Sequence, residues 1–161
     1  MASKKHETIR ASQIKQSQPY SNHKPSDPSV HSPWIYALRQ KKQNEYPTDS
    51  ENSGKWLIFA PTEKVDEIWM KIKNAVEDGF LGNRAKVAPV NNSRPDQFTG
   101  KQRQVICVYT YDWTDKKDVM RVREQLKKLG ITQVISYKTD SDTMAGKYYH
   151  KGSRNISKYR V

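Results

Sequence analysis

Cysteine is almost absent from this sequence, because Cys107 is the only one among 161 residues. One thiol cannot form an internal disulfide and cannot supply a multi-cysteine zinc site. Histidine is scarce as well, and His150 is the only one beyond residue 53. We therefore expect no metal site and no bound cofactor, and we interpret Cys107, which lies in a β-prone run, as a buried structural thiol.

Long apolar runs and catalytic signatures are also missing. No stretch of about 18 apolar residues occurs, so the sequence predicts no membrane-spanning helix. The first residues lack the apolar segment of a signal peptide, which favours a cytoplasmic or nuclear protein. The glycine-rich phosphate loop, the dinucleotide fingerprint and the nucleophile-elbow motif are all absent. These absences favour a non-catalytic role over an enzymatic one.

Positive charge is what the sequence has in excess. Lys and Arg number 29 against 17 Asp and Glu, which gives a formal net charge of +12. Residues 1–53 contain 8 basic and 5 acidic residues, whereas residues 54–161 contain 21 and 12. A basic domain attracts polyanions through its summed field, and the alternative is that the charge serves solubility alone.

The sequence changes character at about residue 54. Residues 1–53 are polar and interrupted by prolines, so we predict a disordered basic tail there. Residues 33–39 are apolar and aromatic, and we expect them to dock on the surface of the domain, with a partner-binding motif as the alternative. Residues 54–161 are predicted to form a single α/β domain.

Strand-like and helix-like patterns alternate in the downstream part. Apolar residues recur at spacings of three and four in residues 65–76 and again in residues 119–129, which predicts two amphipathic helices. Packing these helices on one face of a sheet leaves the other face open to a ligand. The predicted strands cover residues 55–60, 84–89, 104–111, 133–138 and 156–161.

Cations and aromatic residues gather near the ends of these strands and in the polar loop that follows residue 138. Ammonium and guanidinium groups suit phosphate oxygens, and aromatic rings stack on bases. The predicted phosphate contacts are Arg84, Lys86, Lys101, Arg103, Lys138, Lys147 and Arg154, and the predicted stacking residues are Trp56, Tyr109, Tyr111 and Tyr137. Trp69 lies on the apolar stripe of the first helix, where core packing and a partner site are the two interpretations.

Residues 65–69, Val-Asp-Glu-Ile-Trp, follow a predicted strand and begin a predicted helix. They resemble the Val-Glu-Asp-Phe-Trp segment of the cap-binding translation initiation factor 4E. Residues 137–143, Tyr-Lys-Thr-Asp-Ser-Asp-Thr, are similar to the Tyr-Gln-Ser-His-Ala-Asp-Thr of that factor. This resemblance implies that Trp69 receives a partner peptide and that the basic loop 147–154 lies beside phosphates. Since residues 82–89 hold no tryptophan, it implies phosphate contact rather than a tryptophan sandwich around a base.

Four further segments resemble the family named after a basophilic-leukaemia-expressed protein. They are residues 54–56 (Gly-Lys-Trp), 82–89 (Gly-x-x-Ala-Lys-Val-Ala-Pro), 105–110 (Val-Ile-Cys-Val-Tyr-Thr) and 137–140 (Tyr-Lys-Thr-Asp). The resemblance implies an α+β fold like that of initiation factor 4E, with a curved, mostly antiparallel sheet and two amphipathic helices packed on one face.

The leading hypothesis is a non-catalytic module that binds RNA or a phosphorylated nucleotide through a basic, aromatic sheet face. One alternative, which the family resemblance suggests, is a phosphothreonine-lyase-like enzyme in which Lys86 or Lys138 acts as the base. Another is a protein-interaction adaptor that uses the Trp69 helix. A membrane partner is not expected.

Overall fold

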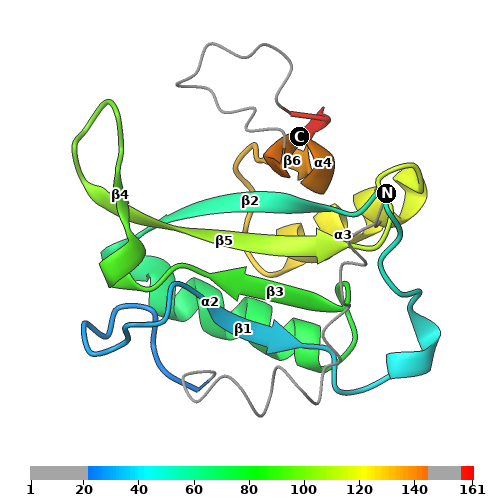
Figure 1. Cartoon of the computed structure of the whole chain (residues 1–161), viewed down its shortest axis with the longest axis horizontal. Coiled ribbons are helices and arrows are strands. Elements are labelled where there is room, and N and C mark those ends of the chain that lie inside the picture. The colour runs from blue at the N-terminus through cyan, green and yellow to red at the C-terminus, as the bar shows by residue number, and fades with distance from the viewer. Residues whose placement is uncertain (1–21, 145–156) are drawn as a thin grey trace, which may run out of the picture.

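The computed structural model describes residues 22–144 and 157–161. These residues form one curved antiparallel sheet with strand order β1-β3-β5-β2-β6-β7, and β4 pairs with the outer part of β5 (Figure 1). The strands are β1 (Ile35–Leu38), β2 (Gly54–Pro61), β3 (Arg84–Val87), β4 (Arg94–Pro95), β5 (Gln102–Thr110), β6 (Ser136–Thr139) and β7 (Tyr159–Arg160).

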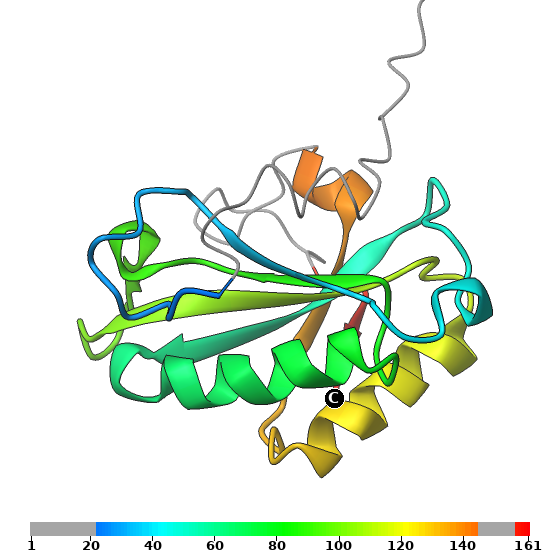
Figure 2. The ribbon, with the colours of Figure 1, turned by 90° about the horizontal axis from the view of Figure 1, so that it is seen from below.

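Helices α2 (Thr62–Glu77) and α3 (Lys116–Lys128) lie side by side on one face of the sheet (Figure 2). The short helix α4 (Asp140–Met144) lies on the opposite side. Two 3-10 turns, η1 (Gln43–Glu45) and η2 (Val90–Asn92), complete the described elements. The predicted fold class, a curved antiparallel sheet with two amphipathic helices on one face, is confirmed. Among the described residues, no helix is long and apolar enough to span a bilayer.

The core lies between the sheet and these two helices. Alternate residues of each strand point into it, so Trp56, Ile58 and Ala60 of β2 are buried together. The ring of Tyr137 packs edge-on against Trp56 at 5.3 Å between ring centroids, and its hydroxyl lies 2.6 Å from the Thr110 hydroxyl. Gly54 faces this tyrosine, and a Cβ at that position would collide with the ring, which explains the glycine.

The fold extends N-terminal to the boundary that the sequence predicts at residue 54. The segment that we expected to dock on the domain is strand β1, and it pairs with β3 from Ile35 opposite Val87 to Leu38 opposite Arg84. Val30 and Ile35 are fully buried in the core. Residues 22–53 are therefore part of the domain, and the description of residues 1–53 as a tail does not hold for residues 22–53.

Candidate nucleic-acid interface on the open face of the sheet

The strand register places cations in a line across the sheet face that α2 and α3 leave uncovered. Lys55 of β2 lies between Tyr109 of β5 and Lys138 of β6 in the pairing register. On the next strand, Arg84 lies over the Tyr109 ring, 3.7 Å from its centroid. Because side chains alternate along a strand, these residues share the face opposite to the buried core.

Lys86 lies two residues after Arg84 on β3 and therefore points to the same face. It is opposite Tyr36 of β1 and Cys107 of β5. Its ammonium lies 3.8 Å from the centroid of the Trp34 ring and 6.0 Å from that of Tyr109. Three of the predicted phosphate contacts, Arg84, Lys86 and Lys138, therefore converge with Lys55, which the sequence analysis did not single out. We call Lys55, Arg84, Lys86 and Lys138 the cation cluster.

Lys55 and Arg84 each form an ion pair with a carboxylate. The Lys55 ammonium lies 2.7 Å from Asp140 and donates to the Thr143 hydroxyl at 2.8 Å. The Arg84 guanidinium lies 3.0 Å from Asp49. Lys86 differs, because no carboxylate in the described part of the chain forms an ion pair with it.

Burial lowers the pKa of the Lys86 ammonium, and the nearby charges of Lys55 and Arg84 lower it further. Burial also lowers the pKa of Lys138, again with a contribution from Lys55. For Lys86 the shift has the sign expected where positive charges crowd around a buried ammonium. For Lys138 the carboxylate of Asp142 acts in the opposite direction. An anion placed among these groups would relieve that repulsion.

Cys107 lies in the middle of this face and is buried. Burial raises the pKa of its thiol, so the reactive thiolate is disfavoured. This agrees with the interpretation of Cys107 as a structural thiol. Among the described residues, no group of three His, Cys, Asp or Glu side chains is placed to hold a metal ion.

The predicted stacking residues do not form an open aromatic surface. Side chains alternate between the two faces along β2 and β6, and this alternation places Trp56 and Tyr137 on the helix side of the sheet. Both side chains are fully buried in the core, so neither ring has a face free for a base. Tyr109 does point to the open face, but Arg84 covers its ring and it is only 5% exposed. The half-buried Trp34 on this face was assigned to the docking segment in the sequence analysis.

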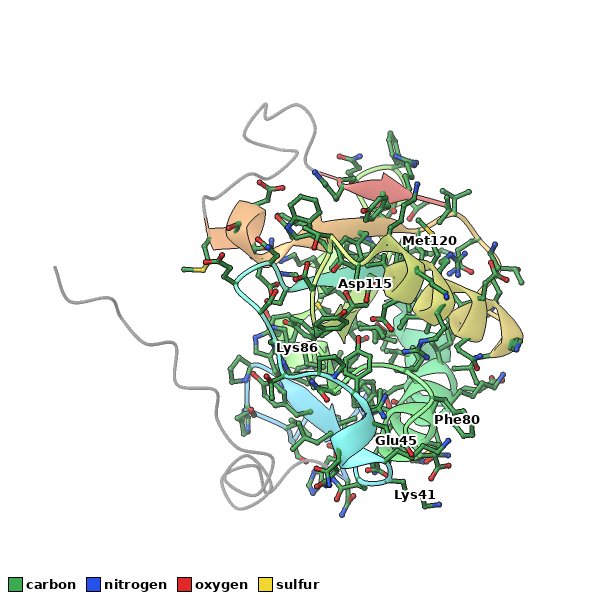
Figure 3. The ribbon with its side chains drawn as sticks, turned by 90° about the vertical axis from the view of Figure 1, so that its right-hand side faces the viewer. Lys41, Glu45, Phe80, Lys86, Asp115 and Met120 are labelled. Carbon is green, nitrogen blue, oxygen red and sulfur yellow. The ribbon has the colours of Figure 1, made fainter. Side chains whose placement is uncertain are left out.

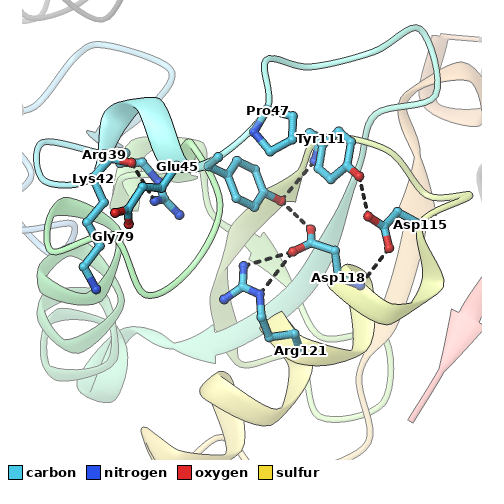
Figure 4. A pocket seen from close by; sticks show the side chains of 10 residues that line it. Arg39, Lys42, Glu45, Pro47, Gly79, Tyr111, Asp115, Asp118 and Arg121 are labelled. Atoms are coloured by element: carbon cyan, nitrogen blue, oxygen red, sulfur yellow. Dashed lines mark hydrogen bonds and ion pairs between the residues drawn. The ribbon is translucent and has the colours of Figure 1, made fainter.

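Tyr111 lies at a different site, at the edge of a cavity of about 290 Å³ beneath the β1–β2 connection (Figure 4). Its hydroxyl donates to Asp115, the residue that caps α3. The hydroxyl of Tyr46 donates to Asp118 at 2.6 Å, and Arg121 lies 3.0 Å from the same carboxylate. These lining groups already bind one another, and their contacts link the β1–β2 connection to α3.

The remaining basic candidates lie elsewhere. Lys101 and Arg103 are at the far end of β5, where Arg103 lies 3.1 Å from Asp96 and its guanidinium stacks 4.4 Å from the centroid of the Phe59 ring. Lys147 and Arg154 lie outside the described residues. The structure thus divides the five predicted phosphate contacts that it describes between two ends of one face.

Trp69 lies on the buried side of α2 and is 2% exposed. Core packing of the ring, one of the two interpretations, is therefore correct. Its indole N–H is buried and finds no hydrogen-bond acceptor within residues 22–144 and 157–161. A buried donor without an acceptor is unusual and costly in a folded protein.

The curved antiparallel sheet, two helices on one face and a basic open face define a protein of the initiation factor 4E fold. The chain belongs to the family of the basophilic leukemia-expressed protein Bles03, whose model matches residues 50–145. Both statements confirm the resemblance that the sequence motifs indicated.

Two solved structures show the likeness of fold. The complex of C. elegans eIF4E-3 with the 4E-binding protein Mextli and cap analog matches with a TM-score of 0.58 at 18% identity, over 92% of this chain and 80% of that one. The complex of Ascaris suum eIF4E-3 with m2,2,7G cap matches with a TM-score of 0.54 at 19% identity, over 92% and 80% of the two chains.

Proposed function

We propose that this protein is a non-catalytic module that binds RNA or a phosphorylated nucleotide through the open face of its sheet. The observation that carries the proposal is the convergence of Lys55 of β2 with Arg84 and Lys86 of β3, the two strands that flank β5. The Lys86 ammonium forms no ion pair with a carboxylate of the described residues. Phosphate oxygens are the ligands that such a set of donors favours.

The fold neighbours support the same class of ligand. One is complexed with a cap analog and the other with m2,2,7G cap. Such cap ligands belong to the class of phosphorylated nucleotides. The half-buried Trp34 beside Lys86 supplies an aromatic ring at the edge of the cation cluster, as nucleotide recognition requires.

Fluorescence anisotropy with a labelled single-stranded RNA and with a nucleoside triphosphate tests the proposal. We expect Lys86→Gln to weaken both affinities by about tenfold or more, because a charge-assisted phosphate contact is lost. The matched control is Lys64→Gln, which removes the same charge from an exposed position on α2. Equal affinities in the two variants, with thermal unfolding unchanged, contradict the proposal.

A partner protein on α2 is the second candidate function. The exposed apolar side chain of Met70, which is 48% exposed on that helix, favours it. The C. elegans neighbour is bound to a 4E-binding protein. Met70→Glu places a charge at this exposed position, so we expect it to abolish co-purification of the partner with little change in thermal stability. Trp34→Phe is the control on the opposite face, and partner recovery unaffected by Met70→Glu rejects this candidate.

An enzyme acting on a phosphorylated substrate is the remaining alternative, and the lowered pKa of Lys86 is the observation that favours it. An amine is a general base only when it is neutral, so burial beside other cations moves Lys86 toward that role. Incubation of the full chain with a phosphothreonine peptide, followed by mass spectrometry, tests it. Release of phosphate that disappears in Lys86→Gln supports an enzyme, whereas an unchanged peptide rejects it.

A further inference from the structure

The end of the open face farthest from the cation cluster carries two exposed aromatic rings. Phe59, near the end of β2, is 47% exposed, and Phe98, in the turn between β4 and β5, is 87% exposed. Large apolar side chains this exposed are a cost to solubility unless something covers them. β4 and the start of β5 form this end of the sheet (Figure 1).

Three cations, Arg94, Lys101 and Arg103, belong to this end of the sheet. Arg103 stacks on Phe59 at 4.4 Å and pairs with Asp96, while Arg94 lies opposite Arg103 in the strand register. Neither Arg94 nor the exposed Lys101 forms an ion pair with any carboxylate of the described residues. We call Phe59, Phe98, Arg94, Lys101 and Arg103 the hairpin platform, and its charge is positive.

The hairpin platform and the cation cluster share one face. Lys55 and Phe59 have the same parity on β2, so both point away from the core. Four residues of extended strand separate them, which is about 13 Å at the usual rise per residue. Stacked nucleotides along one strand repeat at about 3.4 Å, so this interval corresponds to about four of them.

Resting on the proposed function, we infer that the ligand is a single-stranded RNA that crosses the sheet, with phosphates at the cation cluster and a base stacked on Phe59 of the hairpin platform. Two features favour an RNA over a protein partner here. Lys86, Arg94 and Lys101 form no ion pair with a carboxylate of the described residues, and the Arg103 guanidinium stacked on the exposed Phe59 ring forms a flat surface that suits a base. A mononucleotide is too short to reach both sites.

The test measures the affinity of the full chain for uridine monophosphate and for oligouridylates of increasing length, up to about eight nucleotides. We expect the affinity to rise until the RNA spans about four nucleotides and to level off beyond that. Phe59→Ala should weaken the longer RNA roughly five- to a hundredfold, since it removes one stacking contact, and leave the mononucleotide unchanged. Phe59→Trp should keep the long-RNA affinity.

Phe80→Ala is the matched control. Phe80 is 50% exposed, it carries Lys42 over its ring at 4.9 Å, and it lies on the helix side of the molecule, away from Lys86 (Figure 3). We expect this variant to bind every ligand like the unaltered protein. An affinity that does not depend on RNA length, or equal effects of Phe59→Ala and Phe80→Ala, overturns the inference and leaves the proposed function standing.

Two other outcomes separate the hypotheses. Absence of binding to RNA of any length, together with absence of binding to the mononucleotide, overturns the proposed function and this inference together. In the second outcome, the protein sediments with phosphatidylserine vesicles only when Phe59 is present, and its RNA affinity does not depend on Phe59. This result would assign the hairpin platform to a membrane surface, and it would overturn the inference but not the proposed function.

Discussion

Lys86 differs from the other cations of the open face in the neighbours that its ammonium has. Trp34 and Tyr109 supply aromatic rings, while Lys55 and Arg84 supply like charges. A cation in such surroundings gains from the ring faces but loses hydration. An anion bound beside Lys86 would therefore be stabilised by its charge. For this reason Lys86 is the best single position at which to test the proposed function.

The lowered pKa of Lys86 predicts a pH dependence. The groups around it are the thiol of Cys107, the cations Lys55 and Arg84, and the carboxylate of Asp140. As the pH rises from neutral, folded Lys86 loses its proton before the usual lysine value of 10.5, so the cost of burying its charge is relieved and its contribution to stability increases. Over the same range the site loses a positive charge, and we expect RNA affinity to fall.

Lys86→Arg isolates this effect, because a guanidinium stays charged throughout the range. Titration of RNA affinity between about pH 7 and pH 10, the span below the ordinary pKa of a lysine, should show an alkaline decline in the unaltered protein that is much reduced in the variant. Identical pH profiles for the two proteins would show that Lys86 does not carry the ligand's charge.

The sequence identified which residue types would form the basic face but not which aromatic residues would accompany them. Along β2, alternate positions form two sets that face opposite sides of the sheet. One set is Trp56, Ile58 and Ala60, and the other is Lys55, Leu57 and Phe59. Both sets contain large apolar side chains, so alternation alone did not decide which set faces the core. Packing against α2 and α3 decided it, and it buried the tryptophan that we expected to stack.

At the scale of elements, β1 is what the sequence did not predict. It has four residues, and their burial alternates along Ile-Tyr-Ala-Leu in a segment surrounded by prolines and polar residues. Such a short pattern is hard to recognise, and the strand owes its stability to pairing with β3 rather than to its own propensity. The longer helices, with several turns of apolar periodicity, were predicted correctly.

Ile35→Ala tests whether β1 is an integral part of the domain. Ile35 is fully buried, so truncation leaves a cavity and we expect a loss of about 2–4 kcal/mol in the free energy of unfolding. Urea denaturation measures it. Val134→Ala, at a position 64% exposed, should change stability by less than about 0.5 kcal/mol. A similarly small effect of Ile35→Ala would mean that the strand is detached in solution.

Arg123 links α3 to the C-terminal end of the described chain. Its guanidinium is buried and donates to the carbonyls of Ile131, Gln133 and Val161 at 2.9, 2.8 and 3.1 Å. A lysine has one ammonium and cannot reach three acceptors in this fork. We expect Arg123→Lys to cost about 2–3 kcal/mol, because the buried carbonyl of Ile131 and the part-buried carbonyls of Gln133 and Val161 lose donors.

Chemical denaturation of Arg123→Lys provides the measurement, and Arg121→Lys is the comparison. Arg121 is exposed, although it also binds the backbone carbonyls of Phe80 and Leu81. Its replacement should cost less than about 1 kcal/mol, since solvent can satisfy the exposed acceptor groups. Equal losses in the two variants would show that burial of the guanidinium is not what makes the C-terminal link strong.

At the scale of the whole molecule, the fold was easier to predict than the binding surface. Fold class follows from apolar periodicity and from motifs such as residues 65–69, which are local in sequence. The binding surface depends on register, because β3, β5, β2 and β6 are brought side by side in an order that the sequence does not follow. The carboxylates that pair with Lys55 and Arg84, Asp140 and Asp49, come from segments far away in the chain.

The net charge of the whole chain must therefore be distinguished from the charge of the few cations on the open face that contact the RNA. If the RNA meets about four cations across the cation cluster and the hairpin platform, the logarithm of affinity should fall with the logarithm of salt concentration at a slope of about −3. Removing Lys86 should make that slope shallower by about 0.7, the contribution of one phosphate contact on a single strand, whereas removing Lys64 on the helix side should leave it unchanged. Anisotropy titrations at several salt concentrations give all three slopes. A much steeper slope that responds equally to both substitutions would mean that RNA is held by the field of the formal +12 charge as a whole rather than by the open face.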